Sequence, residues 1–335
     1  MKALVVCLDG MTGVVLAGPA VRAVAAGADH VTLMCGPRGE AAAALLPGVD
    51  DILVWDAPWE GSRPPTVDDA DIDGLLRRLR DAAYDVALVL PTSPPGPLPV
   101  ALLLRMAHVP RIAAEGIDHP GTLVDVSHPR LPDRHDVEAG LDLAAALGFG
   151  PRTGDDGRPR VLSAPDTTGL TGNGPYVVLH PGAGAPARCW GAARATETVA
   201  LLADAGHRVV VTGGPGESAL CREVSGDTAV DLGGRTDLRT LAGVLRAADV
   251  VVAGNTGPAH LAAATGTPVV SPYAPVVAAA RRGPYGVPAV LLGDQASPCA
   301  DTRAHHCPVP GHPCLGEVTA QDVLRAVQKL LKEGA

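Results

Sequence analysis

Short apolar runs alternate with stretches of helical periodicity along the first half of the chain. The runs of Val, Leu and Ala predict strands, and the longer periodic stretches between them predict helices. The expected strands are 3–7, 30–34, 85–90 and 111–113, and the expected helices lie near 14–26, 72–83, 97–106 and 137–147. Such alternation is typical of an α/β domain with a parallel, doubly wound sheet.

A stretch rich in Gly, Pro, Thr and Asp, residues 148–174, interrupts this pattern. The pattern then resumes, with strands expected at 176–180, 208–212, 229–231, 249–253 and 269–271 and helices near 192–205, 217–224, 238–247, 258–264 and 320–331. We therefore expect two Rossmann-like domains, residues 1–165 and 176–335, joined by a linker at 166–175, with the last helix packing back on the first domain. Two such sheets place a ligand in the cleft between the carboxyl ends of their strands.

Length and composition agree with two globular domains. The chain has 335 residues, of which 47% are hydrophobic and only 2% aromatic, so Ala, Val and Leu must fill the cores. No apolar run approaches the roughly 20 residues that span a bilayer, and the apolar start of the chain is too short for a signal peptide. The seven cysteines are odd in number, which does not suit a disulfide framework. We expect a cytoplasmic protein with no integral membrane segment.

Negative charge is concentrated in the first half of the chain. Of the net charge of −9, residues 1–165 carry −8 and the remainder −1. An acidic half disfavours nucleic acid and anionic membranes as partners and favours a cationic or neutral one. A solvated acidic surface explains the charge equally well.

The segment HPGAGAPARCW, residues 180–190, follows an expected strand. Gly182 and Gly184 give a flexible backbone with exposed N–H groups, and Arg188 adds a guanidinium. This combination suits a phosphate group. A simple turn with a surface arginine is the alternative.

The segment VVVAGNTGPAHLAAATGTPVV, residues 250–270, predicts a buried strand that runs into a helix. Asn255 or Thr256 can cap this helix, and Pro258 suits its first turn, so free N–H groups and the positive helix end would face the cleft. We expect a diphosphate there. His260 either contacts a phosphate or sugar oxygen or has a core or capping role.

Two further polar side chains follow expected strands in the second half. Glu217, after VTGGPG, can accept hydrogen bonds from ribose hydroxyls or can simply favour a helix N-terminus. Thr236, in GRTDLRTL, lies where an adenine or its ribose could bind, although capping of the next helix would also explain it.

These segments, together with DLGGRTDLRTLAGVLRAADVVVAGNTGPAHLAAATGTPVV and the cysteine-bearing tail, resemble glycosyltransferase family nine. That family contains the ADP-heptose:lipopolysaccharide heptosyltransferases and their actinobacterial relatives. The resemblance begins at AGPAVRAVAAGADHVTLMCGPRG and covers most of the chain. It implies a GT-B fold, with the acceptor mainly on the first domain and the donor nucleotide on the second. It also implies inverting transfer from a nucleotide-sugar without a metal or another cofactor.

The resemblance further implies roles for individual residues. Arg188 stands in place of the usual basic phosphate ligand, Glu217 would bind ribose, and Thr236 would lie near the base. The phosphate motif of the family is matched by Asn255, Thr256, Gly257 and His260, where Asn255 replaces a frequent Asp. Arg188 and the helix that starts near Gly257 would stabilise the departing diphosphate.

The loop after the first strand departs from the family pattern. Family members carry approximately R-x-D-S-x-G-D-V-L-L, in which the Asp of the Gly-Asp pair is the expected general base. Here that pair is Thr12-Gly13, and Gly10 stands at the usual Ser. Asp9 either takes over as the base or braces the glycine loop. Alternatively, another acidic residue serves as the base, or the acceptor needs no strong base. We expect Gly10, Thr12 and Gly13 to line the acceptor side, and a Gly13→Asp change to favour a conventional heptosyl acceptor.

Two segments contain side chains that bind metals in other proteins. The segment DDADID, residues 68–73, immediately precedes an expected helix, so we assign its charge to the helix dipole. The tail holds Cys299, Cys307 and Cys314 among three histidines, but their spacing lacks the C-x₂-C of a zinc knuckle. Since the resembling sequences have a similar loop, we interpret it as structural and predict no metal site.

The sequence therefore predicts an inverting glycosyltransferase that uses an ADP-activated heptose or hexose. The acidic first half favours a soluble, cationic or neutral acceptor, such as a secondary metabolite of the antibiotic type. A heptosyltransferase acting on a cell-envelope glycan or lipopolysaccharide core is one alternative, and a catalytically lapsed nucleotide-sugar binding protein is another. An NAD-dependent dehydrogenase is disfavoured because no G-x-G-x-x-G directly follows the first strand.

Overall fold

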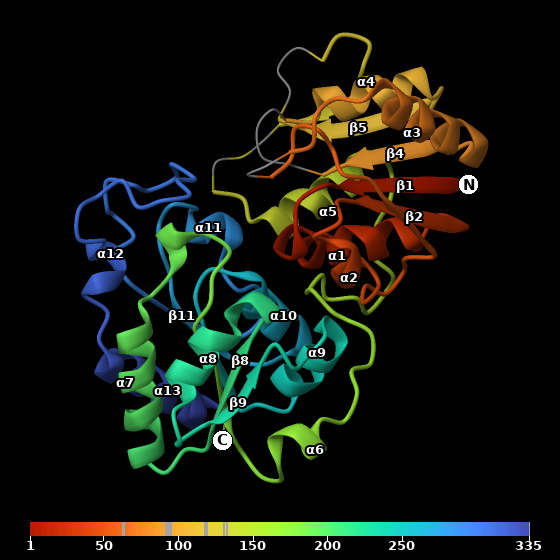
Figure 1. The fold of residues 1–335 in the computed structure, drawn as a ribbon. Coiled ribbons are helices and arrows are strands. Elements are labelled where there is room, and N and C mark those ends of the chain that lie inside the picture. The colour runs from red at the N-terminus through yellow and green to blue at the C-terminus, as the bar shows by residue number, and fades with distance from the viewer. Residues whose placement is uncertain (62–63, 91–95, 117–119, 130, 132, 335) are drawn as a thin grey trace. The chain divides into compact units, whose positions relative to one another are not determined.

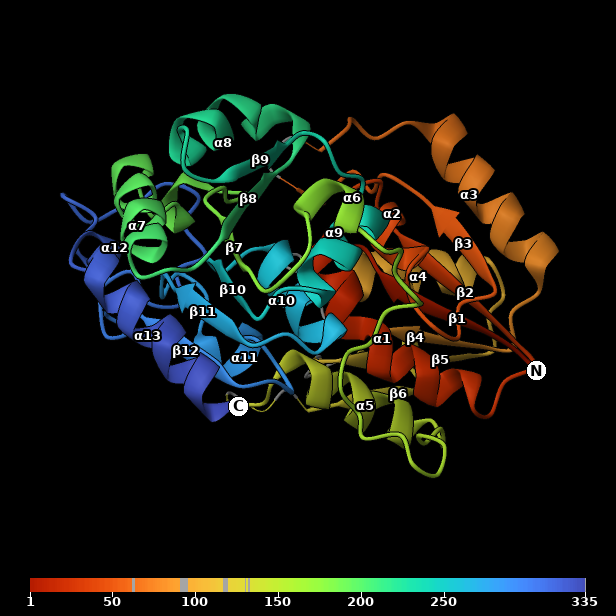
Figure 2. The ribbon, with the colours of Figure 1, turned by 90° about the horizontal axis from the view of Figure 1, so that it is seen from below.

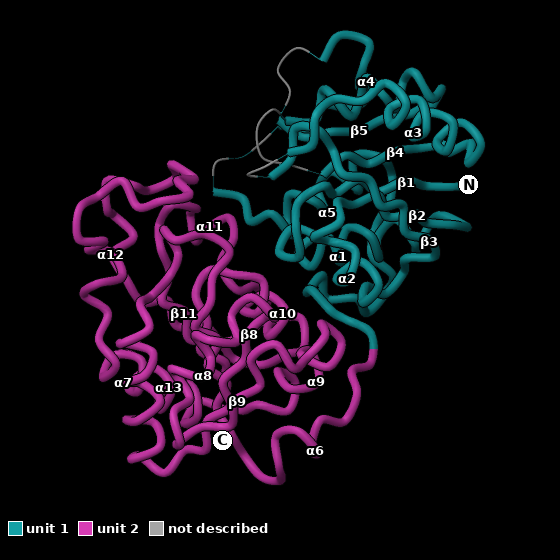
Figure 3. The backbone as a smooth tube through the Cα atoms, in the orientation of Figure 1, with its two compact units in different colours: residues 1–162 teal, residues 163–335 magenta. Residues whose placement is uncertain are grey.

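The computed structural model describes residues 1–335 except 62–63, 91–95, 117–119, 130, 132 and 335. The chain divides into two compact units, Met1–Leu162 and Ser163–Ala335 (Figure 3). The stretch 166–175, expected as a linker, belongs to the second unit. It contains a short helix, α6 (Thr168–Thr171), and the side chains of Thr167 and Thr171 are buried.

The first unit is a six-stranded parallel sheet in the order β3-β2-β1-β4-β5-β6. Its strands are β1 (Lys2–Cys7), β2 (His30–Cys35), β3 (Asp51–Val54), β4 (Val86–Val89), β5 (Arg111–Glu115) and β6 (Val126–His128). Its helices are α1 (Met11–Ala25), α2 (Glu40–Ala43), α3 (Asp69–Ala82), α4 (Leu98–Met106) and α5 (Asp136–Ala146). Helices α1 and α5 pack together on one face, and α3 and α4 cover the other (Figures 1 and 2).

The second unit repeats this plan, with strand order β12-β11-β10-β7-β8-β9. Its strands are β7 (Val177–His180), β8 (Val209–Gly213), β9 (Val230–Gly233), β10 (Val250–Ala253), β11 (Val269–Pro272) and β12 (Ala289–Leu292). Its longer helices are α7 (Ala192–Asp204), α8 (Ser218–Ser225), α9 (Leu238–Arg246), α10 (Gly257–Thr265) and α13 (Ala320–Glu333). Short turns of helix are η1 (Pro186–Arg188), η2 (Pro215–Glu217), α11 (Ala279–Arg282) and α12 (Pro313–Gly316).

Small aliphatic side chains form the core of the second unit. Alternate residues of β7, β8 and β10, such as Leu179, Val211 and Val252, face α7, α8 and α13. Helices α9 and α10 pack against each other. The parallel, doubly wound sheets predicted from the sequence are thus confirmed. In each sheet the strand order reverses beside the first strand, between β1 and β4 and between β7 and β10. Open α/β sheets bind ligands at the carboxyl ends of the strands at such a reversal.

Candidate nucleotide-sugar site

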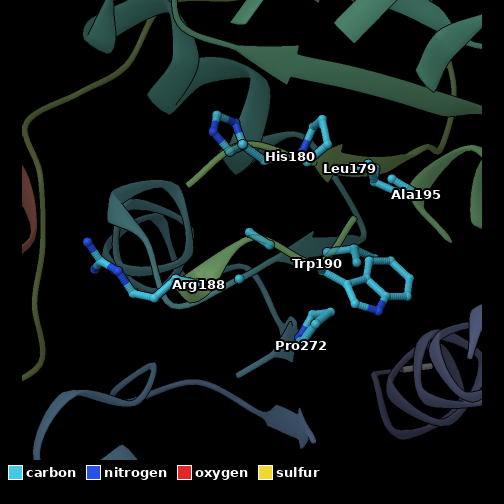
Figure 4. Close-up of a pocket in the computed structure, with 11 residues that line it drawn as sticks. Leu179, His180, Arg188, Trp190, Ala195 and Pro272 are labelled. Atoms are coloured by element: carbon cyan, nitrogen blue, oxygen red, sulfur yellow. The ribbon is translucent and has the colours of Figure 1, made fainter. Parts of the chain in front are cut away.

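The loops that follow β7, β8 and β10 bring the candidate donor residues together in the second unit. These three strands are neighbours in the parallel sheet, so their carboxyl ends lie side by side. A small pocket opens there, with His180, Gly182, Arg188, Trp190 and Gly254 on its wall (Figure 4). The sequence predicted this meeting of loops, and the structure places them at the strand-order reversal of the second sheet.

The Glu217 carboxylate packs closely against the backbone of Gly182. A Cβ at this position would lie 1.9 Å from Oε1 of Glu217, so only glycine leaves room for that carboxylate. Glu217 reaches this place because it ends the η2 turn and its Oε2 accepts a 2.7 Å hydrogen bond from the Gly214 N–H. The carboxylate therefore stabilises its own loop, as the helix-terminus alternative expected. About 30% of the Glu217 side chain remains exposed, which leaves it accessible to a ligand.

His180 is a site residue that the sequence analysis did not single out. It ends the buried strand β7 with only 7% of its side chain exposed. Its Nδ1 lies 3.1 Å from the Thr212 hydroxyl, and its Nε2 lies 3.6 Å from the Glu217 carboxylate. Burial lowers the pKa of His180 below 6.5, and Glu217 opposes that shift. The sequence feature that could have indicated His180 is a single histidine at the last position of an apolar strand.

Arg188 links the loop after β7 to the loop after β10. It ends the η1 turn, its Nη1 donates a 3.1 Å hydrogen bond to the Asn255 carbonyl, and its guanidinium points away from Trp190 (Figure 4). Gly184 lies close to the guanidinium, since a Cβ there would be in van der Waals contact with Arg188 Nη2 at 3.4 Å. The arrangement holds a cation beside the start of α10.

The segment before α10 fixes the backbone at the helix N-terminus. Asn255 is buried, its Nδ2 donates to the Ala274 carbonyl at 3.0 Å, and its Oδ1 accepts from the Ala274 N–H at 3.4 Å. Thr256 has the extended N-cap conformation, but neither side chain caps α10 in the described part of the chain. Thr256 thus occupies the expected N-cap position without a capping hydrogen bond, and Asn255 bonds the loop after β11 instead. Gly257 and Pro258 begin the helix.

Two other candidates lie outside these three loops. His260 is inside α10 with 3% of its surface exposed, as the core alternative expected. Thr236 is half-buried ahead of α9, and it is Asp237 that caps this helix by accepting a 2.7 Å hydrogen bond from the Thr240 N–H. Capping therefore does not account for Thr236.

The glycine loop of the first unit is shorter than expected, because α1 begins at Met11 rather than near residue 14. Thr12 and Gly13 consequently lie in the first turn of the helix, and Gly10 is at the N-cap. Asp9 follows β1, and its Oδ1 accepts a 2.8 Å hydrogen bond from the Gly10 N–H. A Cβ on Gly13 would lie 2.8 Å from Asp9 Oδ2. The Asp9 carboxyl group thus lies over the first turn of α1.

The segments with metal-binding side chains have other roles in the described structure. Asp68 caps α3 through a 2.8 Å bond from the Ala70 N–H, and Asp71 accepts a hydrogen bond from the Trp55 indole. None of the seven cysteines, all of which the structure describes, forms a disulfide, and burial raises the pKa of the Cys314 thiol to about 11. Among the described residues, no three His, Cys, Asp or Glu side chains are arranged to hold a metal ion.

Residues 72–311 match the sequence model of glycosyltransferase family 9 (heptosyltransferase). The chain belongs to this family. A putative glycosyltransferase of Haemophilus influenzae is 33% identical over 113 residues, which cover 32% of this chain and 33% of that protein. The match therefore spans only a third of the curated relative.

Solved structures of family 9 proteins share the fold over the whole chain. The ADP-heptose lps heptosyltransferase II of E. coli matches with a TM-score of 0.74 and 18% identity, covering 100% of both chains. The E. coli heptosyltransferase WaaC with ADP matches with a TM-score of 0.70 and 19% identity, covering 98% of this chain and 100% of that one. The two sheets are thus those of a GT-B glycosyltransferase. None of the helices in the described part of the chain has the length and apolarity needed to cross a membrane.

Proposed function

We propose that this family 9 glycosyltransferase transfers a sugar, with inversion, from an ADP-sugar donor bound to the second unit. The observation that carries the proposal is the Arg188 guanidinium beside the uncapped N-terminus of α10. The donors of the similar E. coli enzymes support ADP as the nucleotide, since one is named for ADP-heptose and the other was solved with ADP.

The second unit supplies positive potential where the leaving group develops charge. When the bond between the sugar and the diphosphate breaks, negative charge grows on the phosphate oxygens. Arg188 and the N–H groups at the start of α10 are held in place before the reaction, so they stabilise this charge without reorganising. A divalent cation is not required for that role. Gly182 and Gly184 let the diphosphate approach the backbone, Glu217 accepts from the ribose hydroxyls, and Thr236 lies near the base.

Asp9 is the proposed general base for the acceptor hydroxyl. Its carboxyl group lies over Gly13, where members of the family usually have their carboxylate, so it offers the same chemistry from a neighbouring position of the loop. Gly10 and Thr12, which are half-buried, form the adjoining acceptor-side surface, whereas Gly13 is buried in the first turn of α1. The hydrogen bond from the Gly10 N–H to Asp9 Oδ1 orients the carboxylate.

The acceptor is proposed to be soluble and cationic or neutral, such as a secondary metabolite of the antibiotic type. The excess of carboxylates in residues 1–165 supports this choice, because it would repel an anionic, phosphate-rich acceptor. Seven cysteines without a disulfide suit a reducing, cytoplasmic setting. The competing acceptor is a cell-envelope glycan or the lipopolysaccharide core. The alternative to catalysis is a protein that binds a nucleotide-sugar without turning it over.

A thermal-shift comparison of ADP, GDP and UDP tests the donor assignment. A ligand of the native state at 100 times its dissociation constant adds about 2.7 kcal/mol of stability. We expect ADP to raise the melting temperature most and Arg188→Ala to abolish most of that rise, with EDTA having no effect. Equal rises in melting temperature with the three nucleotides would reject the assignment of adenine as the preferred nucleobase. A rise that EDTA removes would reject metal independence.

Turnover with a panel of amino-sugar and anionic acceptors tests the proposed acceptor class and the role of Asp9 as general base. Asp9→Asn should lower turnover by about 10²–10⁴-fold while ADP binding stays nearly unchanged. Full turnover in this variant rules out Asp9 as the base. Transfer to none of the acceptors, with tight ADP-sugar binding, supports the binding-protein alternative.

A further inference from the structure

The tail of the second unit, residues 299–318, holds the turn that carries Arg188 through two hydrogen bonds to Ala187. The Ala187 N–H donates to the His305 carbonyl at 3.0 Å, and the Ala187 carbonyl lies 3.1 Å from His312 Nε2. A carbonyl oxygen only accepts hydrogen bonds, so Nε2 of His312 must carry a proton and donate it. Both polar groups of the residue next to Arg188 are therefore bonded to the tail.

The η1 turn has little means of fixing its own geometry. It consists of three residues, and its internal bonds are those from Arg188 N–H to Ala185 at 2.9 Å and from Cys189 N–H to Pro186 at 3.1 Å. Such short 3₁₀ turns have poor hydrogen-bond geometry and depend on their surroundings. Ala187 itself is 1% exposed, so water cannot replace the partners that the tail supplies. The direction of the Arg188 side chain thus depends on these tail contacts as well as on its own hydrogen bond to the Asn255 carbonyl.

His312 has a backbone conformation that is unfavourable for a residue with a side chain. Its φ of 49° and ψ of 51° lie in the left-handed region, where glycine is usual, and Gly311 precedes it at φ 79°. Such conformations persist where the surroundings impose them, and they are common at functional sites. The conformation directs the imidazole of His312 to the Ala187 carbonyl.

We infer that His312 is a positioning residue for nucleotide binding, which acts by holding Ala187 so that the Arg188 guanidinium meets the diphosphate. The inference rests on the proposed function of Arg188. It adds that the histidine- and cysteine-bearing tail is part of the donor site, although none of its side chains needs to touch the donor.

Calorimetric titration with ADP, using the full chain, tests the inference. His312→Leu keeps the bulk of the side chain but removes the donor, and we expect it to weaken ADP binding about three- to tenfold, the usual effect of one neutral hydrogen bond. His312→Gln, whose amide nitrogen reaches a position similar to Nε2, should restore binding to within about twofold. His108→Leu is the matched control, because His108 is also a histidine in the left-handed region, with φ of 65°, but it is exposed and belongs to the first unit. It should bind ADP like the unaltered chain.

The same measurement on Arg188→Ala separates positioning from a general structural effect. If His312 acts through Arg188, adding His312→Leu to Arg188→Ala should cause no further loss of ADP affinity. An equal loss in both backgrounds would overturn the inference, as would unchanged ADP affinity in His312→Leu. If Arg188→Ala itself leaves ADP binding unchanged, it is the proposed function that fails, so the two failures are distinguishable.

Discussion

At the scale of single residues, Asp9 and Gly13 compete for one volume. A Cβ on Gly13 would lie 2.5 Å from the Cβ of Asp9 and 2.9 Å from its Cγ, closer than unbonded carbon atoms come. The loop therefore holds one carboxylate at this place, from Asp9 or from position 13, but not both. The sequence-based expectation that Gly13→Asp alone favours a conventional acceptor does not allow for this contact.

Gly13→Asp should consequently destabilise the chain by about 1–3 kcal/mol, as overpacking does, and should lower turnover. The double variant Asp9→Gly, Gly13→Asp removes the collision and should recover most of that stability. Urea unfolding gives the free energies. Gly74→Ala in α3 is a control, because a Cβ there meets only the end of the Arg77 side chain at 3.9 Å and should stabilise the helix. A stable Gly13→Asp single variant would contradict the prediction.

His180 makes the stability of the chain depend on pH. Its pKa is lowered below 6.5 mainly by burial, so below that pH the unfolded chain binds a proton that the folded chain does not. The free energy of unfolding should therefore fall as the pH is lowered from 6.5, by at most about 1.4 kcal/mol per pH unit for this one proton. His180→Gln keeps a polar partner for Thr212 and should show a shallower fall in urea titrations between pH 7 and pH 5. Parallel curves for the two proteins would show that His180 is not the group responsible.

At the scale of elements, two neighbouring residues at the start of α9 have different expected roles, one in helix capping and one in nucleotide binding. Asp237 caps the helix and Thr236 does not, so the two neighbours should respond differently to alanine. Asp237→Ala should lower the free energy of unfolding by about 1 kcal/mol. Thr236→Ala should leave stability nearly unchanged and weaken the binding of ADP. If Thr236→Ala binds ADP normally, Thr236 has no contact with the nucleotide.

The strands that the sequence analysis missed are edge strands. β3, β6 and β12 were not predicted, and each forms an edge of its sheet. Most of their residues are exposed or partly buried, and in β12 no residue is fully buried. The interior strands are buried except at the first residue of β1, β2 and β5, and they gave clear apolar runs. The start of α1 was placed three residues late because Gly10 and Gly13 resemble a loop, while Gly13 is in fact a helical position where no side chain would fit.

At the scale of the whole molecule, the sequence predicted which loops form the candidate site but not which atoms hold them. Parallel strands and the reversal of their order suffice to bring the loops after β7, β8 and β10 together. The hydrogen-bond partners within the site could not be predicted in this way, because they depend on contacts between segments that are distant in the sequence. The bond from Asn255 to Ala274 and that from His312 to Ala187 leave no periodic signal in the chain. Sequence reasoning therefore assigned Asn255 a capping role and did not connect the tail to Arg188.

Trp190 gives the second unit a built-in optical label. The chain has three tryptophans, and the other two, Trp55 and Trp59, lie edge to face in the first unit with ring centroids 5.2 Å apart. Trp190 is buried two positions beyond Arg188, and its indole N–H donates to the Val318 carbonyl at 3.1 Å, which ties it to the same tail as His312. A chain with phenylalanine at positions 55 and 59 would have Trp190 as its single tryptophan fluorophore. Its emission would then follow movements of the arginine turn in real time, without an attached dye.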